Sequence, residues 1–385
     1  MKVFLIAGEL SGDRLGAALM EGLKELVPDV TFEGVGGPLM MTQGMQSLFP
    51  MDELSVMGIA EVLPKYRHLV KRMQQTAQAV LDSQPDVLIT IDSPDFCLRV
   101  AREVKASSQI RTVHYVAPSV WAWRPKRAVK MAKVIDQVLA LLPFEPPLME
   151  AAGVRCDFVG HPVVNEPVAS DAETHAFRMA HGLGEAPLLV TLPGSRRGEV
   201  SRLTPTFGEV VALMKQTRPD IQVVLPAAAP VVDLVRELTT DWAHQPIILD
   251  PNGMDESAAL IQKRSAFRAA DVALAASGTV SLELAASATP MVIAYDMNWL
   301  SWQIMSRMAL VDTVTLVNLV TDTRAVPEFL GPDFRPEAIA PALLTILDDP
   351  ATQQQAMDMT MEMLGRGQAR PGLRAATAVI DGLES

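Results

Sequence analysis

Short apolar runs alternate along the chain with segments in which apolar residues recur at helical spacing. This alternation is typical of βαβ units, in which crossover helices join parallel strands, and it disfavours all-β and all-α folds. The apolar runs predict strands over residues 3–7, 31–35, 87–91, 112–116, 137–140, 156–159, 188–192, 222–226, 246–249, 272–276 and 291–295. Helices are predicted over residues 15–26, 68–83, 96–105, 200–215, 231–239, 267–270 and 280–288, followed by a helical tail over 350–385 that is broken near 365–372.

A strand–loop–helix arrangement occurs twice, about half the chain apart. Residues 2–7 lead into the small-residue loop 8–13, and residues 188–192 lead into the loop 193–199. Such a unit places backbone N–H groups and a helix N-terminus at the carboxyl edge of a parallel sheet, where anions and nucleotides bind. We therefore expect an α/β protein with two doubly wound domains that face one cleft, joined by a proline-containing hinge over 160–167.

The composition excludes several classes of protein. A chain of 385 residues exceeds the roughly 250–300 residues that one hydrophobic core supports, which agrees with two domains. The net charge of −12 argues against a nucleic-acid-binding surface, although a local basic patch remains compatible with contact to an anionic membrane. The two cysteines, Cys97 and Cys156, lie far apart, and the six histidines show no ligand spacing. We therefore expect no disulfide framework, no metal and no other cofactor.

Two apolar stretches could be mistaken for targeting or membrane segments. The N-terminal run 3–7 is too short for a signal-peptide core, and residues 272–295 are interrupted by polar residues and by Pro290. The sequence therefore predicts a protein of the reducing cytoplasm with no membrane span.

In the first half, carboxylates follow two of the predicted strands. Glycines at 8, 12 and 16 do not form a dinucleotide fingerprint, so a nicotinamide enzyme is disfavoured. Ser11 or Asp13 could cap the next helix, whereas Glu9, at the carboxyl end of its strand, is expected to point into the cleft. Asp92 and Asp95 follow the buried strand 87–91, where either could cap a helix or act as a general base on a hydroxyl.

Aromatic and basic residues gather between positions 115 and 127. Trp121 and Trp123 lie beside Arg124 and Lys126. The segment is either a surface loop with solvated cations or a platform for a sugar or amphipathic ligand, whose phosphate the cations would bind, and its density of such residues favours the platform.

A further segment, 56–72, is apolar at first and then mixes apolar with basic residues. The helix over 68–83 needs only a core-facing stripe, but the preceding residues Met57, Ile59, Val62 and Leu63 are harder to bury in a connector. We interpret these four as a candidate contact with a membrane surface or an acyl chain.

In the second half, two loops have the composition of a phosphate site. Gly194, Ser195 and Arg196 offer backbone N–H groups, a helix N-terminus and a guanidinium. The segment Ser277-Gly278-Thr279 repeats the arrangement, and Glu283 follows within one turn of helix. Glu283 either accepts hydrogen bonds from ribose hydroxyls or simply complements the helix dipole, and we favour the first interpretation because no other charge lies nearby.

Together these segments resemble the lipid-A-disaccharide synthase family of inverting glycosyltransferases. The similarity rests on Ala7-Gly8-Glu9 with Ser11-Gly12-Asp13, Val56-Met57-Gly58, Ile91-Asp92 with Pro94-Asp95-Phe96, His114-Tyr115-Val116 with Pro118-Ser119-Val120-Trp121-Ala122-Trp123-Arg124, Leu142-Pro143-Phe144-Glu145, Leu192-Pro193-Gly194-Ser195-Arg196 and Ala276-Ser277-Gly278-Thr279. The resemblance implies a GT-B fold with an acceptor-binding Rossmann-like domain over 1–165 and a UDP-sugar-binding one over 166–350. It also implies a helical segment, 351–385, that packs back on the first domain.

The resemblance further implies a reaction and a location. 2,3-Diacylglucosamine would pass from UDP-2,3-diacylglucosamine to the 6-hydroxyl of 2,3-diacylglucosamine 1-phosphate, giving a β-1,6-linked disaccharide and UDP. The enzyme would act in a Gram-negative bacterium, as a peripheral protein on the cytoplasmic face of the inner membrane and without a cofactor, and a homodimer is one oligomeric state open to it.

The resemblance also assigns roles to residues. It implies that Asp92 and Arg196 are needed for activity and that Asn318 lies in the nucleotide region. We expect Asp92 to be the base, with Glu9 and Asp95 as alternatives, and Arg196 with the N–H groups of 277–279 to stabilise the leaving UDP. Ser11, Gly12, Trp123, Arg124 and Lys126 are expected on the acceptor side of the cleft. A UDP-sugar 2-epimerase of the same fold and a non-catalytic nucleotide-sugar-binding protein are the alternatives.

Overall fold

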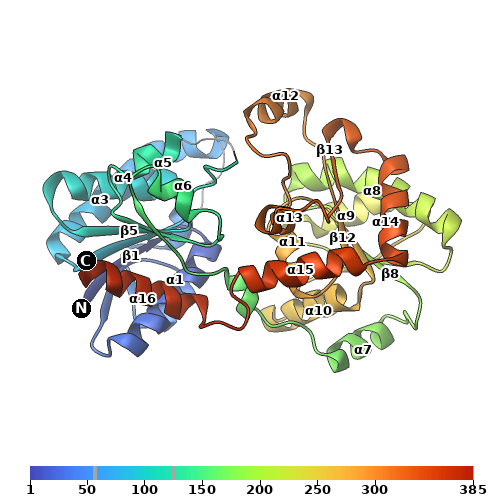
Figure 1. Cartoon of the computed structure of the whole chain (residues 1–385), viewed down its shortest axis with the longest axis horizontal. Coiled ribbons are helices and arrows are strands. Elements are labelled where there is room, and N and C mark those ends of the chain that lie inside the picture. The colour runs from blue at the N-terminus through green and yellow to red at the C-terminus, as the bar shows by residue number, and fades with distance from the viewer. Residues whose placement is uncertain (55–58, 123–125, 385) are drawn as a thin grey trace. The chain divides into compact units, whose positions relative to one another are not determined.

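The structure is a computed structural model that describes residues 1–54, 59–122 and 126–384 (Figure 1). The chain forms two compact units, of which the first comprises Met1–Asn165 with Leu364–Ser385 and the second Glu166–Met363. We expected the C-terminal segment 351–385 to pack as one piece on the first domain. It is instead divided between the two units. Helix α15 (Ala351–Met363) packs on α11 and α13 of the second unit, and only α16 (Pro371–Glu384) packs on α1 of the first.

The first unit is built on a seven-stranded sheet in the order β3-β2-β1-β4-β5-β6-β7, and all its strand pairs are parallel. Its strands are β1 (Lys2–Ala7), β2 (Thr31–Val35), β3 (Gln46–Ser47), β4 (Val87–Ile91), β5 (Arg111–Tyr115), β6 (Gln137–Ala140) and β7 (Arg155–Phe158). Besides α16, its α-helices are α1 (Leu10–Leu26), α2 (Pro38–Thr42), α3 (Ile59–Ser83), α4 (Pro94–Ser107), α5 (Lys126–Met131) and α6 (Pro146–Glu150).

The second unit repeats this plan with a six-stranded parallel sheet in the order β10-β9-β8-β11-β12-β13. Its strands are β8 (Leu188–Leu192), β9 (Gln222–Pro226), β10 (Ile247–Leu249), β11 (Val272–Ala275), β12 (Met291–Tyr295) and β13 (Glu328–Leu330). Besides α15, its α-helices are α7 (Asp171–Ala180), α8 (Arg197–Thr217), α9 (Val232–Thr239), α10 (Glu256–Ala269), α11 (Val280–Ala286), α12 (Trp299–Met308), α13 (Leu316–Thr321) and α14 (Pro336–Asp348).

The central strands are buried on both faces, which explains their continuous apolar runs. In β1, Leu5 faces a core cluster shared with α1 and α16, whereas Phe4 and Ile6 face a second cluster shared with α3 and α4. The alternation follows the two-residue period of a strand. Helices therefore cover both faces of the sheet, as the doubly wound prediction requires.

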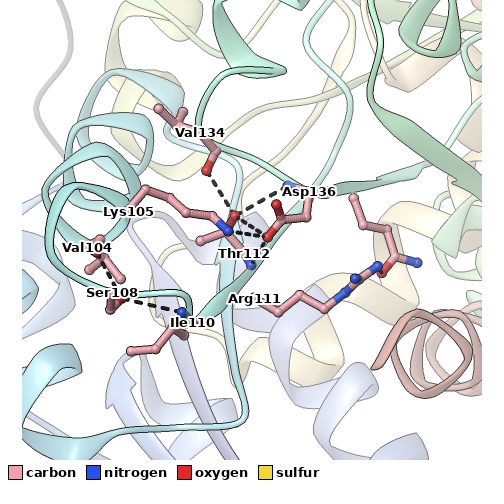
Figure 2. Close-up of polar contacts among 9 residues, drawn as sticks. Val104, Lys105, Ser108, Ile110, Arg111, Thr112, Val134 and Asp136 are labelled. Carbon is pink, nitrogen blue, oxygen red and sulfur yellow. Dashed lines mark hydrogen bonds and ion pairs between the residues drawn. The ribbon is translucent and has the colours of Figure 1, made fainter. Parts of the chain in front are cut away.

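A polar cluster secures the amino ends of β5 and β6 (Figure 2). The Asp136 carboxylate accepts hydrogen bonds from Lys105 Nζ at 2.6 Å and from the Thr112 N–H at 2.8 Å. Partial burial disfavours the charged carboxylate, but the contacts with Lys105 and Thr112 outweigh it and hold the pKa of Asp136 below its usual value. The cluster thus lies at the edge of the sheet opposite the carboxyl ends of the strands, where parallel sheets bind ligands.

The structure extends or corrects several predicted elements. Helix α3 begins at Ile59, so the segment that we interpreted as a connector before residue 68 is largely helical. Helix α10 spans Glu256–Ala269 rather than 267–270, and β5 ends at Tyr115 rather than Val116. The short edge strands β3 and β13 and the helices between residues 299 and 348 were not predicted. In the parts of the chain that the structure describes, no helix is both long and apolar enough to cross a bilayer.

Helices α1 and α16 approach each other closely because glycines occupy the contact. A Cβ atom on Gly22 would lie 2.7 Å from the carbonyl oxygen of Gly372, and a Cβ atom on Gly372 would clash with the carbonyl oxygen of Ala18. The opposing atoms belong to the backbone, which cannot move aside as a flexible side chain does.

Gly22→Ala and Gly372→Ala should each lower the free energy of unfolding by about 1–3 kcal/mol, because the helices must separate to admit the methyl group. Gly198→Ala is the matched control, since no atom lies within 4 Å of its Cβ position and alanine favours a helix. Denaturant unfolding measures the three effects. Equal stability of all three variants would contradict the proposed role of the close contact.

Candidate functional site

The second unit contains a pocket of about 650 Å³ at the carboxyl ends of its strands. Leu192 ends β8, Pro226 ends β9, Leu249 ends β10, and Ala276 follows β11, and all four line the pocket. Residues of helix α10 also line the pocket. Its volume is that of an ordinary small-molecule site.

The two loops that the sequence singled out come together in this pocket. Strands β8 and β11 are neighbours, with Leu192 beside Ala275. The loops that follow them therefore begin at the same point of the sheet edge. The pocket lining includes every residue predicted for both loops, together with the predicted glutamate: Gly194, Ser195, Arg196, Ser277, Gly278, Thr279 and Glu283.

In the first loop, a carboxylate of the chain itself meets the expected anion-binding groups. Glu199 accepts hydrogen bonds from the N–H groups of Ser195 at 3.3 Å and Arg196 at 3.4 Å, and from Arg196 Nη1 at 3.3 Å. Gly194 is required here, because its φ is +107° and a Cβ atom would lie 2.6 Å from the Glu199 carboxylate. The sequence did not show this role of Glu199, which makes the loop N–H groups less available than we expected.

The second loop is open. Gly278 has φ +136°, and no atom lies within 4 Å of its Cβ position. Within the described chain, no acceptor faces the backbone N–H groups of Ser277, Gly278 and Thr279. Thr279 precedes helix α11, so these three donors lie at a helix start, where negative charge is favoured.

Glu283 does not stand alone in the pocket. Its carboxylate lies 2.5 Å from Lys263 Nζ, and both side chains remain partly exposed. Lys263 belongs to α10, and sequence reasoning missed it because only the end of that helix was recognised. The available signal was Asp255, which caps the helix by accepting the Ser257 N–H at 3.1 Å.

Asn318 lies outside this pocket lining. It is fully buried in α13, where its side-chain amide donates to Val326 O at 2.9 Å and to Thr313 Oγ1 at 3.2 Å and its Oδ1 accepts the Val326 N–H at 3.0 Å. The side chain thus ties α13 to the segment before β13.

In the first unit, the backbone is strained where the predicted carboxylates lie. Asp92 and Ser93, directly after β4, have φ of 51° and 43°, and Val116, directly after β5, has φ of 82°. Each such residue costs about 1–3 kcal/mol and is typical of functional sites. Gly8, after β1, packs against the same turn, because a Cβ atom there would lie 2.7 Å from Ser93 Oγ.

The other residues proposed for this edge differ in exposure. Glu9 occupies the position before α1 and is half-buried, Ser11 is exposed, and Gly12 is buried. The Asp95 side chain is 92% exposed, with Arg127 Nη2 at 3.8 Å. Asp13 has a structural role, since its carboxylate accepts the N–H groups of Gly37, Leu39 and Met40 at 2.9–3.0 Å and caps α2.

A buried carboxylate, Glu145, forms a hydrogen bond with the aromatic segment. Glu145 accepts hydrogen bonds from Trp121 Nε1 at 3.3 Å and from the Leu142 N–H at 3.0 Å, and Trp121 stands edge-on to Phe144 at 5.4 Å. Burial raises the pKa of Glu145 to about 7, despite the opposing hydrogen bonds. The sequence marked this glutamate only as part of the family resemblance.

The remaining predicted residues are placed only in part. Trp123, Arg124 and Met57 lie outside the described residues, while Lys126 is an exposed residue at the start of α5. Ile59, Val62 and Leu63 belong to α3. In the described ranges, no group of three histidine, cysteine, aspartate or glutamate side chains is arranged to hold a metal ion.

Solved structures with the same architecture include nucleotide-sugar enzymes. A UDP-GlcNAc 2-epimerase from Neisseria meningitidis bound to UDP-GlcNAc matches with a TM-score of 0.64 at 12% identity, covering 100% of both chains. A glycosyltransferase from Rickettsia africae matches with a TM-score of 0.62 at 12% identity, covering 100% of this chain and 98% of the other. These similarities show the fold, which is GT-B.

The sequence comparisons are more specific. The family model described as lipid-A-disaccharide synthetase matches residues 3–379. A lipid-A-disaccharide synthase from Ruegeria pomeroyi is 62% identical over 383 residues, covering 100% of this chain and 96% of the relative. Another, from Rhodospirillum centenum, is 46% identical over 385 residues, covering 98% and 94%. The chain therefore belongs to the lipid-A-disaccharide synthase family of glycosyltransferases.

Proposed function

We propose that this glycosyltransferase moves 2,3-diacylglucosamine from its UDP conjugate to the 6-hydroxyl of 2,3-diacylglucosamine 1-phosphate, and that the pocket of the second unit holds the UDP. One observation carries the placement of UDP: open N–H donors, Arg196, Lys263 and Glu283 converge on a single pocket at the ends of β8 and β11. A diphosphate needs donors and cations, and a ribose needs a carboxylate acceptor. Family membership supports the reaction.

The charges in the pocket suggest how the donor is held. Arg196 and the N–H groups of Ser277–Thr279 bind the diphosphate and stabilise the charge that develops on UDP as it leaves. Glu283 accepts hydrogen bonds from the ribose hydroxyls, while Lys263 compensates its charge. Glu199 must release Arg196, at least in part, for the guanidinium to reach a phosphate.

Asp92 is proposed as the base that removes the proton from the acceptor hydroxyl. Inversion requires attack from the side opposite the leaving UDP, so the base must belong to the acceptor side of the reaction. The position of Asp92 directly after β4, at the carboxyl edge of the sheet, supports this assignment, and its left-handed backbone is of a kind that clusters at active sites. Glu9 follows the neighbouring strand and is the alternative, whereas Asp95 is largely exposed.

Both proposed substrates carry acyl chains, so the enzyme is proposed to act at the cytoplasmic face of the inner membrane. Met57, Ile59, Val62 and Leu63 are the proposed contact in the first unit. Farther along α3, Leu69, Met73, Ala77 and Val80 pack against the core, as their spacing predicts. The core therefore accounts for these later turns of the helix.

An epimerase of the same fold is not favoured, although the structural neighbours include epimerases. At 12% identity this similarity extends only to the fold, so the family match favours the transferase. Release of UDP only in the presence of an acceptor lipid separates the two, and UDP binding without turnover would indicate a non-catalytic binding protein.

Asp92→Asn should lower the rate of UDP release roughly 10²–10⁴-fold while leaving the affinity for UDP unchanged, because an amide cannot take the proton. Asparagine tolerates the left-handed backbone at this position, so the turn should be preserved. Steady-state assays and calorimetry measure the two quantities. Asp95→Asn is the control and should retain most activity, and near-normal turnover of Asp92→Asn would remove Asp92 from the role of base.

Arg196→Ala should weaken UDP binding roughly tenfold to a hundredfold, the range expected for a lost hydrogen bond to a charged group. Arg197→Ala is the matched control, since Arg197 is an exposed neighbour that does not line the pocket. Calorimetric titration with UDP measures both. Equal affinities of the two variants would refute the placement of the diphosphate.

The triple variant Ile59→Ser, Val62→Ser and Leu63→Ser should co-sediment less with phospholipid vesicles, because it removes the proposed apolar contact in α3. Leu26→Ser, at an exposed apolar position of the same unit, is the control. Unchanged co-sedimentation of a folded triple variant would show that these three residues do not contact the membrane.

A further inference from the structure

Glu199 lies in the pocket where the first loop offers its donors to an anion. Its carboxylate faces the N–H groups of Ser195 and Arg196, at 3.3 and 3.4 Å, and Arg196 Nη1, at 3.3 Å. Backbone N–H groups and a guanidinium at a helix start are the groups that bind phosphates in proteins. Both Arg196 and Glu199 line the pocket. The chain therefore presents a carboxylate of its own to the donors that the proposed diphosphate needs.

The loop has room for this carboxylate because residue 194 is glycine. A Cβ atom on Gly194 would lie 2.6 Å from Glu199 Oε2 and 2.8 Å from Glu199 Cβ. The Glu199 side chain is 19% exposed, whereas that of Arg196 is 68% exposed. The carboxylate is thus largely covered, while the guanidinium remains accessible to a ligand.

Glu199 binds these donors more weakly than a comparable helix cap in the same unit. It occupies the third position of α8, as Glu173 does in α7, and each carboxylate accepts the N–H of the residue before its helix. In α7, the Ser170 N–H lies 2.8 Å from the Glu173 carboxylate. The matching distance at Glu199 is 3.4 Å, which is long for such a hydrogen bond. The bonds of Glu199 are therefore the easier to break, as displacement by a ligand requires.

A displaced Glu199 carboxylate has a second cation beside it. Arg202 follows by three positions on α8, and side chains at that spacing are neighbours on a helix. Arg202 Nη1 lies 3.3 Å from the Asp296 carboxylate, and both side chains are partly exposed. Burial raises the pKa of the Tyr295 phenol, and the charges of Glu199 and Arg202 both act on it. Glu199 and Arg202 therefore share one neighbourhood, in which the carboxylate can change partners.

We propose that Glu199 is an internal competitor of the diphosphate, which lowers the affinity of the pocket for UDP and so speeds the release of UDP after the transfer. The inference rests on the proposed function, because it takes the phosphates of UDP to bind where Glu199 lies. An incoming phosphate displaces the carboxylate from Arg196 and the loop N–H groups. As UDP leaves, the carboxylate returns, so these donors are not left without an acceptor. Product release limits the rate of many enzymes, so weaker binding of UDP favours turnover.

The experiment compares Glu199→Gln with wild type by calorimetric titration of the full-length chain with UDP. Glutamine caps a helix as glutamate does but carries no charge, so the loop should keep its structure. The affinity for UDP should rise about threefold to tenfold, because a phosphate displaces a neutral amide more easily than a carboxylate. The inhibition constant of UDP as a product should fall by the same factor in steady-state assays.

Three comparisons separate this effect from a structural role of Glu199. Uridine has no phosphate, so its affinity should be the same for Glu199→Gln and for wild type. Glu209→Gln removes the same charge from an exposed position of α8 outside the pocket lining, and it should leave the affinity for UDP unchanged. Glu199→Ala loses the cap as well as the charge, so it should unfold at a lower temperature and still bind UDP more tightly than wild type.

Unchanged or weaker UDP binding by both Glu199 variants overturns the proposal and leaves Glu199 as a helix cap alone. An equal rise in affinity for uridine and for UDP also overturns it, because the pocket would then have changed as a whole. Failure of the proposed UDP placement is recognised separately, since Arg196→Ala would then bind UDP as tightly as Arg197→Ala does. That result overturns both proposals, whereas weaker binding by Arg196→Ala with no gain in Glu199→Gln overturns the competitor alone.

Discussion

The parallel pairing of β1 with β4, and of β8 with β11, determines where the candidate site residues that follow these four strands lie. In each unit the first strand is flanked by the second strand on one side and by a strand from later in the chain on the other. At such a switch point the connecting helices depart toward opposite faces of the sheet, and the loops open a crevice at the carboxyl ends. Glu9 and Asp92 follow the two switch strands of the first unit, and Arg196 and Ser277 follow those of the second.

The two units place different groups at this edge. The edge of the first unit carries carboxylates on a strained backbone, whereas the pocket of the second combines cations and carboxylates with open N–H donors. Both pocket cations already contact carboxylates of the chain, Arg196 with Glu199 and Lys263 with Glu283. Partly exposed ion pairs contribute little net stability, so the contact between Arg196 and Glu199 can exchange at low cost. A third carboxylate, Glu256, also lines the pocket, so its lining carries two cations and three carboxylates.

Apolar surface is the second recurring constraint. The sheets need helices on both faces, which uses most of the apolar residues of α1, α3, α4 and α16. Helix α12 lies outside this requirement, since Trp302 packs on Gly331 while Trp299 and Ile304 stay exposed.

The sequence by itself determined the order of the elements and most strand bounds, because each buried strand carries its own apolar run; β2, β4, β8 and β12 end where predicted. It also identified both pocket loops, since glycine and charge after a strand are local signals. The edge strands β3 and β13 were not predicted, because two or three residues are too few to show a hydrophobic periodicity. Only the tertiary structure decided that Lys263 meets Glu283, that Glu199 occupies the first loop, that Asp92 and Ser93 are strained and that α15 and α16 belong to different units. These features depend on how helices and loops pack in space, which local patterns along a chain do not specify.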